Sequence, residues 1–283
     1  MIINMHAHLR KDDVKKDPIK GLVIIKGLSI SEMEIDEYVK HCSDLGITKV
    51  CISCTTSLKS GKNEDVKEVL FKRYPDFFIG FGYVDIDGEK PEIVNKLFDE
   101  GFKGLKLICP LKNYNDKEYF SFYEKASQLN MPILFHTGWV SPMGDKDISC
   151  DRMQPIYLDT IARAFPELIL IGAHLGNISY MWQAIEIITK VPNIYFDLTG
   201  GTIRNLPFSF LKTLFSVSAQ PNLRTTEEII NKNIFKKIIY GSDNPKPEVL
   251  LEFYNNLMRL FDIDEETKKL VLGGTAAKIL NIK

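Results

Sequence analysis

The stretch IYLDTIARAFPELILIGAH at residues 156–174 joins the two patterns that decide the fold. Residues Ile156–Phe165 carry apolar side chains at helical spacing, and Leu168–His174 is a short apolar run that ends in a histidine. A second run of this kind, ILFH at residues 133–136, precedes the helical pattern. Strand, helix and strand in this order predict a parallel sheet whose strands are connected by helices.

Short apolar runs alternate with helical patterns along the whole chain. The predicted strands are Ile2–His6, Lys49–Cys54, Phe77–Val84, Gly104–Ile108, Ile133–His136, Leu168–His174, Ile194–Asp197 and Ile238–Ser242. The predicted helices are Glu32–Leu45, Asp65–Tyr74, Glu92–Glu100, Lys117–Leu129, Ile156–Phe165, Tyr180–Thr189 and Glu248–Leu260. Glycine just past a helix, as at Gly46 and Gly101, and proline soon after one, as at Pro75, mark where helices stop.

Eight strands that alternate with helices in a chain of 283 residues favour closure into a single (β/α)8 TIM barrel. An open doubly wound sheet is the alternative fold, but no GxGxxG turn follows the first strand. We therefore expect one domain over residues 1–283. The segment Thr199–Lys232 is longer than a simple connection, and we expect it to be a βα-loop that reaches over the barrel mouth.

The charges of the chain nearly cancel. A net charge of -1, from 36 basic and 37 acidic side chains, provides no overall field that would attract nucleic acid or an anionic membrane. The basic cluster Lys11–Lys20 is interrupted by aspartates and is interpreted as a solvated loop. The N-terminal MIINMHAHLR lacks a signal-peptide pattern, and no apolar run approaches the roughly 18 residues of a membrane span. We expect a cytoplasmic protein that binds neither nucleic acid nor membrane.

The five cysteines are odd in number and scattered, which predicts reduced thiols rather than a disulfide framework. Cys51 and Cys54 form a CxxC inside VCISC, but no second pair exists to complete a zinc site. Their apolar flanks indicate a buried strand. We interpret both as inert thiols of the core.

Four of the five histidines fall at the ends of predicted strands: His6, His8, His136 and His174. The active sites of TIM barrels form at the C-terminal ends of the strands, where side chains from distant parts of the sequence converge. These four histidines are therefore expected to meet. The fifth, His41, lies in a helical stretch and is assigned no function.

His6 and His8 form an HxH pair on the first strand. A spacing of two places both imidazoles on one face of a strand, so that both can contact one ion. Imidazole nitrogens and a carboxylate suit zinc, with three or four protein ligands and an open position for water. A lone histidine is more often a structural residue. An HxH followed by two more histidines and an aspartate at later strand ends favours a metal site.

The motifs around these residues resemble the amidohydrolase superfamily, in particular the branch of small amidohydrolase-related proteins that includes the aminocarboxymuconate-semialdehyde decarboxylase type. The similarity runs over nearly the whole chain. In chain order the motifs are NMHAH, GFKGLKL, PILFHTG, FPELILIGAHLG, PNIYFDLTG, IIYGSDNP and GGTAAKIL. Each motif is weak by itself, and their order and completeness carry the resemblance.

The resemblance implies a TIM barrel of the metallo-dependent hydrolase type that binds one divalent ion, with Zn2+ as the expected metal. It implies His6, His8, His136 and Asp243 as the ligands of that ion. His174 would be a catalytic or second-metal histidine, and Asp243 would also carry a proton of the metal-bound water.

Two further features resemble the dihydroorotase type. Lys106 occupies the strand-four position of a carboxylated lysine that bridges two ions, so a second ion held by Lys106 and His174 stays open. Arg10 matches an arginine that holds a substrate carboxylate there. The strand-eight segment GSDNP belongs instead to the decarboxylase-like branch, whose members generally bind one metal. One ion is therefore favoured, with Lys106 as a cation that binds substrate.

The implied enzyme is a metal-dependent hydrolase in which a metal-activated water attacks an amide, lactone or other C–N or C–O bond. Asp243 and His174 are the available proton carriers. The alternative is non-oxidative decarboxylation of an unsaturated or aromatic carboxylic acid, because the branch contains both chemistries on one ligand set. A metal-binding barrel without catalysis is disfavoured, because a mere metal holder needs neither proton carrier.

Arg10 and Lys106 open into the same cavity if the predicted strand register holds. Two cations beside a divalent ion predict a small substrate with at least one carboxylate, which Arg10 would hold away from the metal. The alternative for Arg10 is a surface ion pair with Asp12 or Asp13.

Trp139, Arg152 and Arg204 are further candidate contacts from the βα-loops, and a solvated surface position is the alternative for each. The sequence leaves the oligomeric state open, a homo-oligomer included.

Overall fold

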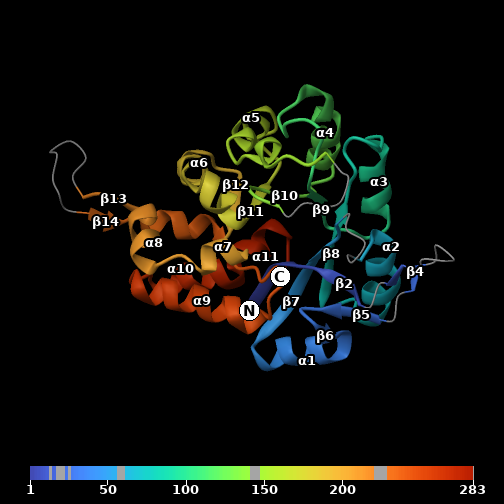
Figure 1. Cartoon of the computed structure of the whole chain (residues 1–283), viewed down its shortest axis with the longest axis horizontal. Helices are drawn as coiled ribbons and strands as arrows, with labels where there is room; N and C mark the ends of the chain where they lie inside the picture. The colour runs from blue at the N-terminus through green and yellow to red at the C-terminus, as the bar shows by residue number, and fades with distance from the viewer. Residues whose placement is uncertain are drawn as a thin grey trace.

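Eight parallel strands form one sheet that curves into a barrel, as seen in the computed structural model of the chain (Figure 1). The structure describes residues 1–12, 15–16, 23–24, 27–55, 61–140, 147–219 and 228–282. Around the barrel the strands follow chain order: β1 (Ile2–Ala7), β7 (Ile47–Ser53), β8 (Phe78–Tyr83), β9 (Gly104–Leu107), β10 (Ile133–His136), β11 (Leu170–Ala173), β12 (Ile194–Asp197) and β15 (Ile238–Ile239). The predicted TIM barrel is confirmed.

The barrel closes where β15 meets β1. Ala7 and Asp243 form a parallel bridge, and the backbone amide of Met5 donates to the carbonyl of Tyr240 over 2.9 Å. Asn4 fastens this seam, because its side chain donates to Ser242 Oγ (2.8 Å) and accepts from the Ser242 amide (3.0 Å). The first and last strands of the chain therefore end side by side.

The core has an inner and an outer part. Inside the barrel, Ile3, Phe81, Leu134 and Ile171 pack together with Ala276 of helix α11 (Thr275–Ile279). A Cβ at Gly273 would lie 2.7 Å from the carbonyl oxygen of Met1, so the segment before α11 packs against the start of β1. This arrangement fills the end of the barrel where the strands begin and leaves the opposite end for a site.

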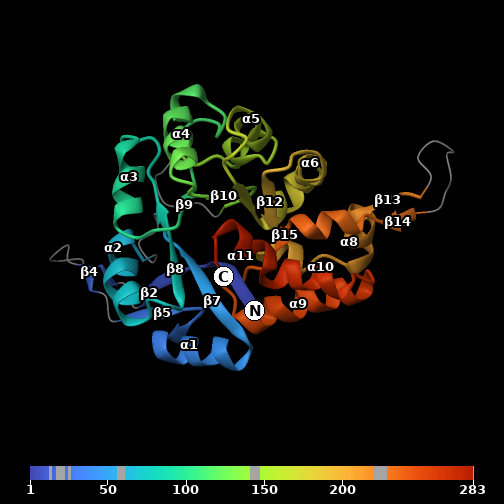
Figure 2. The same cartoon turned by 180° about the vertical axis from the view of Figure 1, so that it is seen from behind.

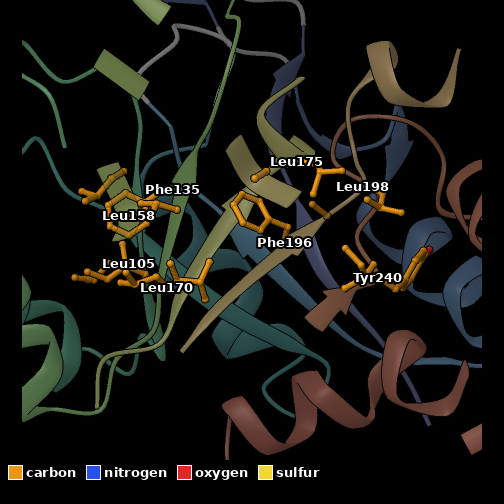
Figure 3. Packing of buried hydrophobic residues seen from close by; sticks show 14 of the residues in the cluster. Leu105, Phe135, Leu158, Leu170, Leu175, Phe196, Leu198 and Tyr240 are labelled. Carbon is orange, nitrogen blue, oxygen red and sulfur yellow. The ribbon is translucent and has the colours of Figure 1, made fainter. Parts of the chain in front are cut away.

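The outer core lies between the strands and the helices that surround them. Figure 3 shows Leu105, Phe135, Leu170 and Phe196 on neighbouring strands and Leu158 of α5 (Tyr157–Ala164) among the buried side chains. Burial of a side chain of this size contributes about 1.5–3 kcal/mol to folding. This layer holds the strand ends rigidly in place.

The predicted helices are present, with boundaries that differ by a few residues. They are α1 (Ile35–Asp44), α3 (Glu92–Asp99), α4 (Phe120–Gln128), α5, α6 (Asn177–Lys190) and α9 (Pro247–Leu260). The pattern at Asp65–Tyr74 differs, because α2 (Asn63–Asp65) continues as a π-helical segment at Val66–Phe71. A short helix α10 (Glu265–Lys269) precedes α11. Among the described residues, none of the helices has the length and apolar character needed to span a membrane.

The segment Thr199–Lys232 contributes to the barrel mouth as predicted, and it also forms elements that were not predicted. Residues at the start line the barrel mouth, but the segment also forms α7 (Gly201–Arg204), α8 (Phe208–Phe215) and the hairpin strands β13 (Ser216–Ser218) and β14 (Glu228–Ile230). The hairpin lies at the far end of the molecule from β4 (Val23–Ile24) in both views (Figures 1 and 2). Leu211, Leu214 and Phe215 are buried, which explains why α8 is a helix and not a loop.

The solvated loop predicted for Lys11–Lys20 is also corrected. Residues Leu9–Asp12 form β2, which pairs with β5 (Gly27–Ile30), and β5 pairs with β6 (Met33–Glu34). Lys15–Lys16 form β3, which pairs with β4. The Lys11 ammonium lies 2.7 Å from an Asp65 carboxylate oxygen, and this ion pair anchors β2. The other residues of the cluster lie outside the described residues.

Candidate active site and metal centre

A cavity of about 660 Å³ lies at the C-terminal ends of the barrel strands. The predicted site residues that line it are His8, Arg10, Lys106, His136, Trp139, His174 and Asp243. His6 is fully buried beneath them. The structure therefore brings all the predicted site residues to one end of the barrel, which is where active sites of this fold form.

His6, His8 and Asp243 form the tightest group in the cavity. The Nε2 atoms of His6 and His8 are 3.1 Å apart, and Asp243 Oδ1 lies 3.1 Å from His8 Nε2 and 3.9 Å from His6 Nε2. One ligand atom from each of the three residues lies within 4.8 Å of the others, a spacing that could hold a metal ion.

The other ring nitrogens fix where the protons of His6 and His8 lie. His6 Nδ1 is 2.9 Å from Asp197 Oδ2, and His8 Nδ1 is 2.7 Å from the carbonyl oxygen of Ser53. Both partners only accept hydrogen bonds, so both neutral rings carry their proton on Nδ1. Two Nε2 lone pairs and one carboxylate oxygen then face each other at close range. A positive charge among them, such as a metal ion would supply, relieves their mutual repulsion.

Asp243 reaches this group because the chain turns sharply at the barrel seam. Its backbone has φ of +60°, and its amide donates to the carbonyl of His6 over 2.6 Å. Two residues earlier, a Cβ at Gly241 would lie 2.9 Å from Thr199 Cγ2 and 3.0 Å from His6 Cβ. Glycine is required there because β15 passes so close to β1 and β12.

His136 lies in the cavity wall but outside the tight group. Its Nε2 is 3.1 Å from the carbonyl oxygen of Trp139, so this nitrogen donates a hydrogen bond and Nδ1 is left as the electron-pair donor. The rings of His136 and His174 have their centroids 4.7 Å apart. Burial, together with the charges of neighbouring groups, keeps the pKa of His136 well below its usual value, so the ring is neutral.

Asp197 is a central residue that the sequence analysis did not single out. It accepts hydrogen bonds from His6 Nδ1 (2.9 Å), from the His174 amide (2.8 Å), and from the Thr199 hydroxyl (2.6 Å) and amide (3.0 Å). His6, His174 and Asp197 also satisfy the spacing of a metal group. Oδ1 of Asp197 receives three of these four hydrogen bonds and Oδ2 receives the one from His6, so we interpret Asp197 as a hydrogen-bonding centre rather than as a ligand.

Burial dominates the electrostatics of the site. It lowers the pKa of His6 to about 3, with the nearby Lys106 charge acting in the same direction. Burial also lowers the pKa of Lys106 to about 8. It opposes ionisation of Asp197, but the contacts with His6 and His174 outweigh it and keep the pKa of that carboxyl below its usual range. Neutral imidazoles and ionised carboxylates are the forms that bind metal ions.

Two cations in the cavity lack partners. Lys106 is 1% exposed, and its Nζ has no hydrogen-bond partner within the described residues. The guanidinium of Arg10 likewise makes no hydrogen bond or ion pair in the part of the chain that the structure describes, although its backbone pairs with Ser29. The side chain of Asp12 and all of Asp13, proposed as its surface partners, lie outside those residues.

Of the remaining candidate residues, one lies at the cavity and the others lie away from it. Trp139 is 57% exposed at the cavity rim. Arg152 pairs with Asp147 over 2.9 Å, and neither it nor Arg204 is among the residues that line the cavity. His41 lies 2.7 Å from Glu248 on the outside of the barrel.

The CxxC cysteines behave as predicted. Cys51 and Cys54 are buried, and their burial raises the pKa of both thiols.

Solved structures share this fold at low sequence identity. A "probable 2-pyrone-4,6-dicarboxylic acid hydrolase" from Acinetobacter baumannii, with citric acid bound, is 14% identical, with a TM-score of 0.65 over 99% of both chains. The 5-carboxyvanillate decarboxylase LigW from Sphingomonas paucimobilis is 16% identical, with a TM-score of 0.57 over 87% of this chain and 83% of that chain. A 2,6-dihydroxybenzoate decarboxylase from Rhizobium is 15% identical, with a TM-score of 0.58 over 88% of this chain and 89% of that chain.

Sequence comparison is more specific. Protein fluG of Emericella nidulans is 31% identical over 74 residues, which make up 26% of this chain and only 8% of that protein. A family model described as Amidohydrolase matches residues 3–282. Because this match covers nearly the whole chain, the protein belongs to the amidohydrolase family, as the motifs predicted.

Proposed function

We propose that this protein is a metal-dependent hydrolase that acts on an amide, lactone or other C–N or C–O bond of a small, carboxylate-bearing substrate. The observation that carries the proposal is the convergence of His6 Nε2, His8 Nε2 and Asp243 Oδ1, three electron-pair donors within about 4 Å of one another. Without a cation among them, these three donors would repel one another in a buried environment, and nothing would compensate for that cost.

The donor set fits zinc. Two imidazole nitrogens and a carboxylate oxygen are typical ligands of this metal, and catalytic sites leave a further position open. Asp197 and the Ser53 carbonyl orient the two imidazoles, as outer partners of metal-binding histidines generally do. His136 offers its Nδ1 from the adjacent wall and would complete a set of four ligands.

The chain's own residues provide the rest of the chemistry. A bound divalent ion would act as a Lewis acid and lower the pKa of a water molecule at the open position. Asp243, through the carboxylate oxygen that does not face the histidines, would accept a proton from that water and return it to the leaving group. His174 lines the same cavity and is a second proton acceptor. Trp139, at the rim, would cover a planar part of the substrate.

The cations of the cavity define the substrate class. Arg10 and Lys106 both line the cavity, and neither has a protein partner among the described residues. An unpaired buried charge is costly, so a negatively charged group of the substrate is the natural partner. We propose that Arg10 binds a carboxylate at the end of the substrate away from the metal, with Lys106 as the cation nearer to it.

A second ion is the less favoured arrangement. It would require Lys106 to carry a carboxyl group on Nζ and His174 to serve as a ligand. The group that joins His6 and His174 contains Asp197, whose carboxylate already accepts four hydrogen bonds, so it supports one ion better than two.

Decarboxylation of an unsaturated or aromatic carboxylic acid is the second candidate. The fold is shared with two carboxylic acid decarboxylases, and the unpaired cations suit a carboxylic acid equally well.

Turnover by the zinc-loaded full-length chain distinguishes the two reactions. Lactones, cyclic amides and unsaturated or aromatic acids are incubated with the protein, and both ring opening and CO2 are measured. We expect hydrolysis without CO2, and loss of activity after chelation and in Asp243→Asn. Release of CO2 would establish the second candidate instead, and a fully loaded protein that is inert towards every class would contradict both.

A further inference from the structure

Thr199 stands between a buried carboxylate and a histidine ring. It belongs to the segment DLTG at residues 197–200, which follows β12 and has no part in the proposed chemistry. The Thr199 hydroxyl oxygen is 2.6 Å from Asp197 Oδ1 and 2.8 Å from His174 Nδ1. All three side chains are at least 95% buried, since Thr199, Asp197 and His174 are 0%, 1% and 5% exposed.

The single proton of the hydroxyl settles the direction of both hydrogen bonds. Asp197 Oδ1 already accepts from the His174 and Thr199 amides and so faces the hydroxyl as an acceptor, and at 2.6 Å a hydroxyl lone pair facing it would be strongly repelled. The Thr199 hydroxyl therefore donates to Asp197. Its oxygen is then available only as an acceptor for His174, so His174 Nδ1 must carry a proton and donate it.

We infer that Thr199, with Asp197 behind it, is a positioning residue that holds His174 in the tautomer protonated on Nδ1. The Nε2 atom of His174, on the opposite side of the ring, is then a lone pair directed at the cavity.

The backbone of the neighbouring segment packs against the ring of His174. A Cβ at Gly200 would lie 3.1 Å from His174 Nδ1, so the backbone closes over that edge of the ring and leaves little room for water. His174 itself has φ of +67°, a left-handed conformation that costs energy in a non-glycine residue. Its amide donates to the same Asp197 carboxylate, so one group fixes both the backbone and the ring of His174.

The tautomer decides what His174 can do. A neutral ring with a lone pair on Nε2 accepts a proton or binds a cation, but it cannot polarise a substrate carbonyl by donating a hydrogen bond. This consequence rests on the proposed function. The tautomer itself does not, because it is a property of the resting protein.

The test reads the proton position directly. Full-length protein labelled with 15N in its histidine rings is studied by two-bond 1H–15N correlation spectra, with zinc bound and after chelation. The chain has only five histidines, and a His174→Gln spectrum identifies the His174 signals. We expect Nδ1 to be protonated in the wild type and in Thr199→Ser, which keeps the hydroxyl. In Thr199→Val, we expect the fixed Nδ1 proton to be lost to a mixture of tautomers.

Thr137→Val is the matched control. Thr137 is equally buried and bonds the backbone around His174, accepting from the Gly176 amide, but it does not touch the ring. We expect the wild-type proton position in this variant. A proton on Nε2 of His174 in the wild type would overturn the inference even if no variant folded, and so would a Thr199→Val spectrum identical to the wild type. Failure to find any hydrolysed substrate would overturn the proposed function and leave this result standing.

Discussion

Lys106 carries a charge that the barrel interior does not balance. Lys237, by contrast, has its pKa lowered by burial to the same value of about 8, but its ammonium donates to the carbonyls of Pro192 and Ile194. The two lysines therefore have similarly lowered pKa values, although among the described residues only Lys237 has hydrogen-bond partners. A buried ammonium that is kept without a partner indicates selection for ligand binding rather than for stability.

Lys106→Met is expected to stabilise the metal-free protein. A pKa of about 8 in place of 10.5 means that below pH 8 the buried ammonium reduces the unfolding free energy by about 3 kcal/mol. In the folded wild type this cost disappears as pH rises from about 8 to 10.5, because the folded protein then binds fewer protons than the unfolded chain. The gain of the variant should therefore be largest below pH 8 and fade above it.

Denaturant unfolding across pH 6–10 measures this gain, and Lys237→Met is its control. Lys237 has the same lowered pKa of about 8, but its ammonium also has carbonyl partners whose loss costs about 1–2 kcal/mol, so we expect a smaller gain below pH 8 than for Lys106→Met. Equal effects of both substitutions would show that Lys106 has a structural partner after all. In activity assays, Lys106→Met should lower kcat/KM despite its greater stability.

Arg10→Lys tests the carboxylate at the far end of the substrate. Lysine keeps the charge but not the planar pair of donors, and losing such a contact costs about 1.5–3 kcal/mol. We expect kcat/KM to fall tenfold or more with unchanged metal content. Arg152→Lys, which alters an arginine that pairs with Asp147 away from the cavity, should leave kcat/KM unchanged. Equal turnover of neutral and carboxylated substrates by the wild type would contradict the role of Arg10.

Single residues show how far the sequence could predict the site. The histidines and Asp243 were predictable because each stands at a strand end, where a barrel gathers its functional groups. Asp197 also stands at a strand end, but its role depends on four donors that come from three segments of the chain. Thr199 was missed because a threonine after a strand has no distinctive pattern. Its proposed role depends on the hydroxyl proton being donated to Asp197 rather than to His174.

At the scale of elements, β1 contains an irregularity that the sequence could not reveal. Regular alternation predicts His6 and His8 on one face and Met5 on the other. The register of β1 against β7 shifts between Asn4 and Ala7, and as a result Met5 joins the inner core while His6 also points inward, towards Asp197. The HxH pair thus faces the cavity as predicted, with a bulge that lets the strand fill the barrel and carry the site.

The seam between β1 and β15 is expected to couple stability to metal binding. Asn4→Ala removes the side chain that holds Ser242, next to Asp243, and should cost about 2–3 kcal/mol of unfolding free energy. Because Asp243 follows directly, we also expect weaker zinc binding in an equilibrium titration.

Asn193→Ala is the control for the seam. Asn193 is similarly buried and donates to the carbonyls of Ala162, Phe165 and Leu168, outside the cavity. It should lose comparable stability and keep the zinc affinity of the wild type. If the two variants bind zinc alike, the seam does not position Asp243.

The accuracy of the sequence-based prediction differs between the strands of the barrel and the inserted elements. Strands β10 and β12 begin and end at the predicted residues, because each is a short apolar run that is buried on both faces. Helix α8 and the hairpin β13–β14 were not predicted, since they belong to an insertion whose pattern follows no repeat of the barrel. Such insertions take their structure from what they pack against, and the sequence alone does not provide that.

At the scale of the whole molecule, barrel closure is what makes a site from separate segments. His6 and Asp243 are separated by 237 positions in the chain. Ala7, which follows His6, nevertheless pairs with Asp243 where the barrel closes. A closed barrel of eight strands in chain order necessarily brings the first strand next to the last. The position of the site could therefore be predicted as soon as the barrel fold was predicted. The lining contributed by connecting segments, such as Trp139 and Gly201, depends on loop conformation, and for that reason the substrate is not readable from the sequence.

The metal content of histidine variants tests the central claim most directly. Zinc-saturated wild type, His6→Ala and His41→Ala are freed of unbound metal by gel filtration, and bound zinc is measured per chain beside a circular dichroism check of folding. His41 is the one histidine of the chain that lies outside the site, paired with Glu248. We expect about one zinc per chain in the wild type and His41→Ala, and a folded His6→Ala that retains almost none. A folded His6→Ala with the zinc content of the wild type would contradict the assignment of this metal centre.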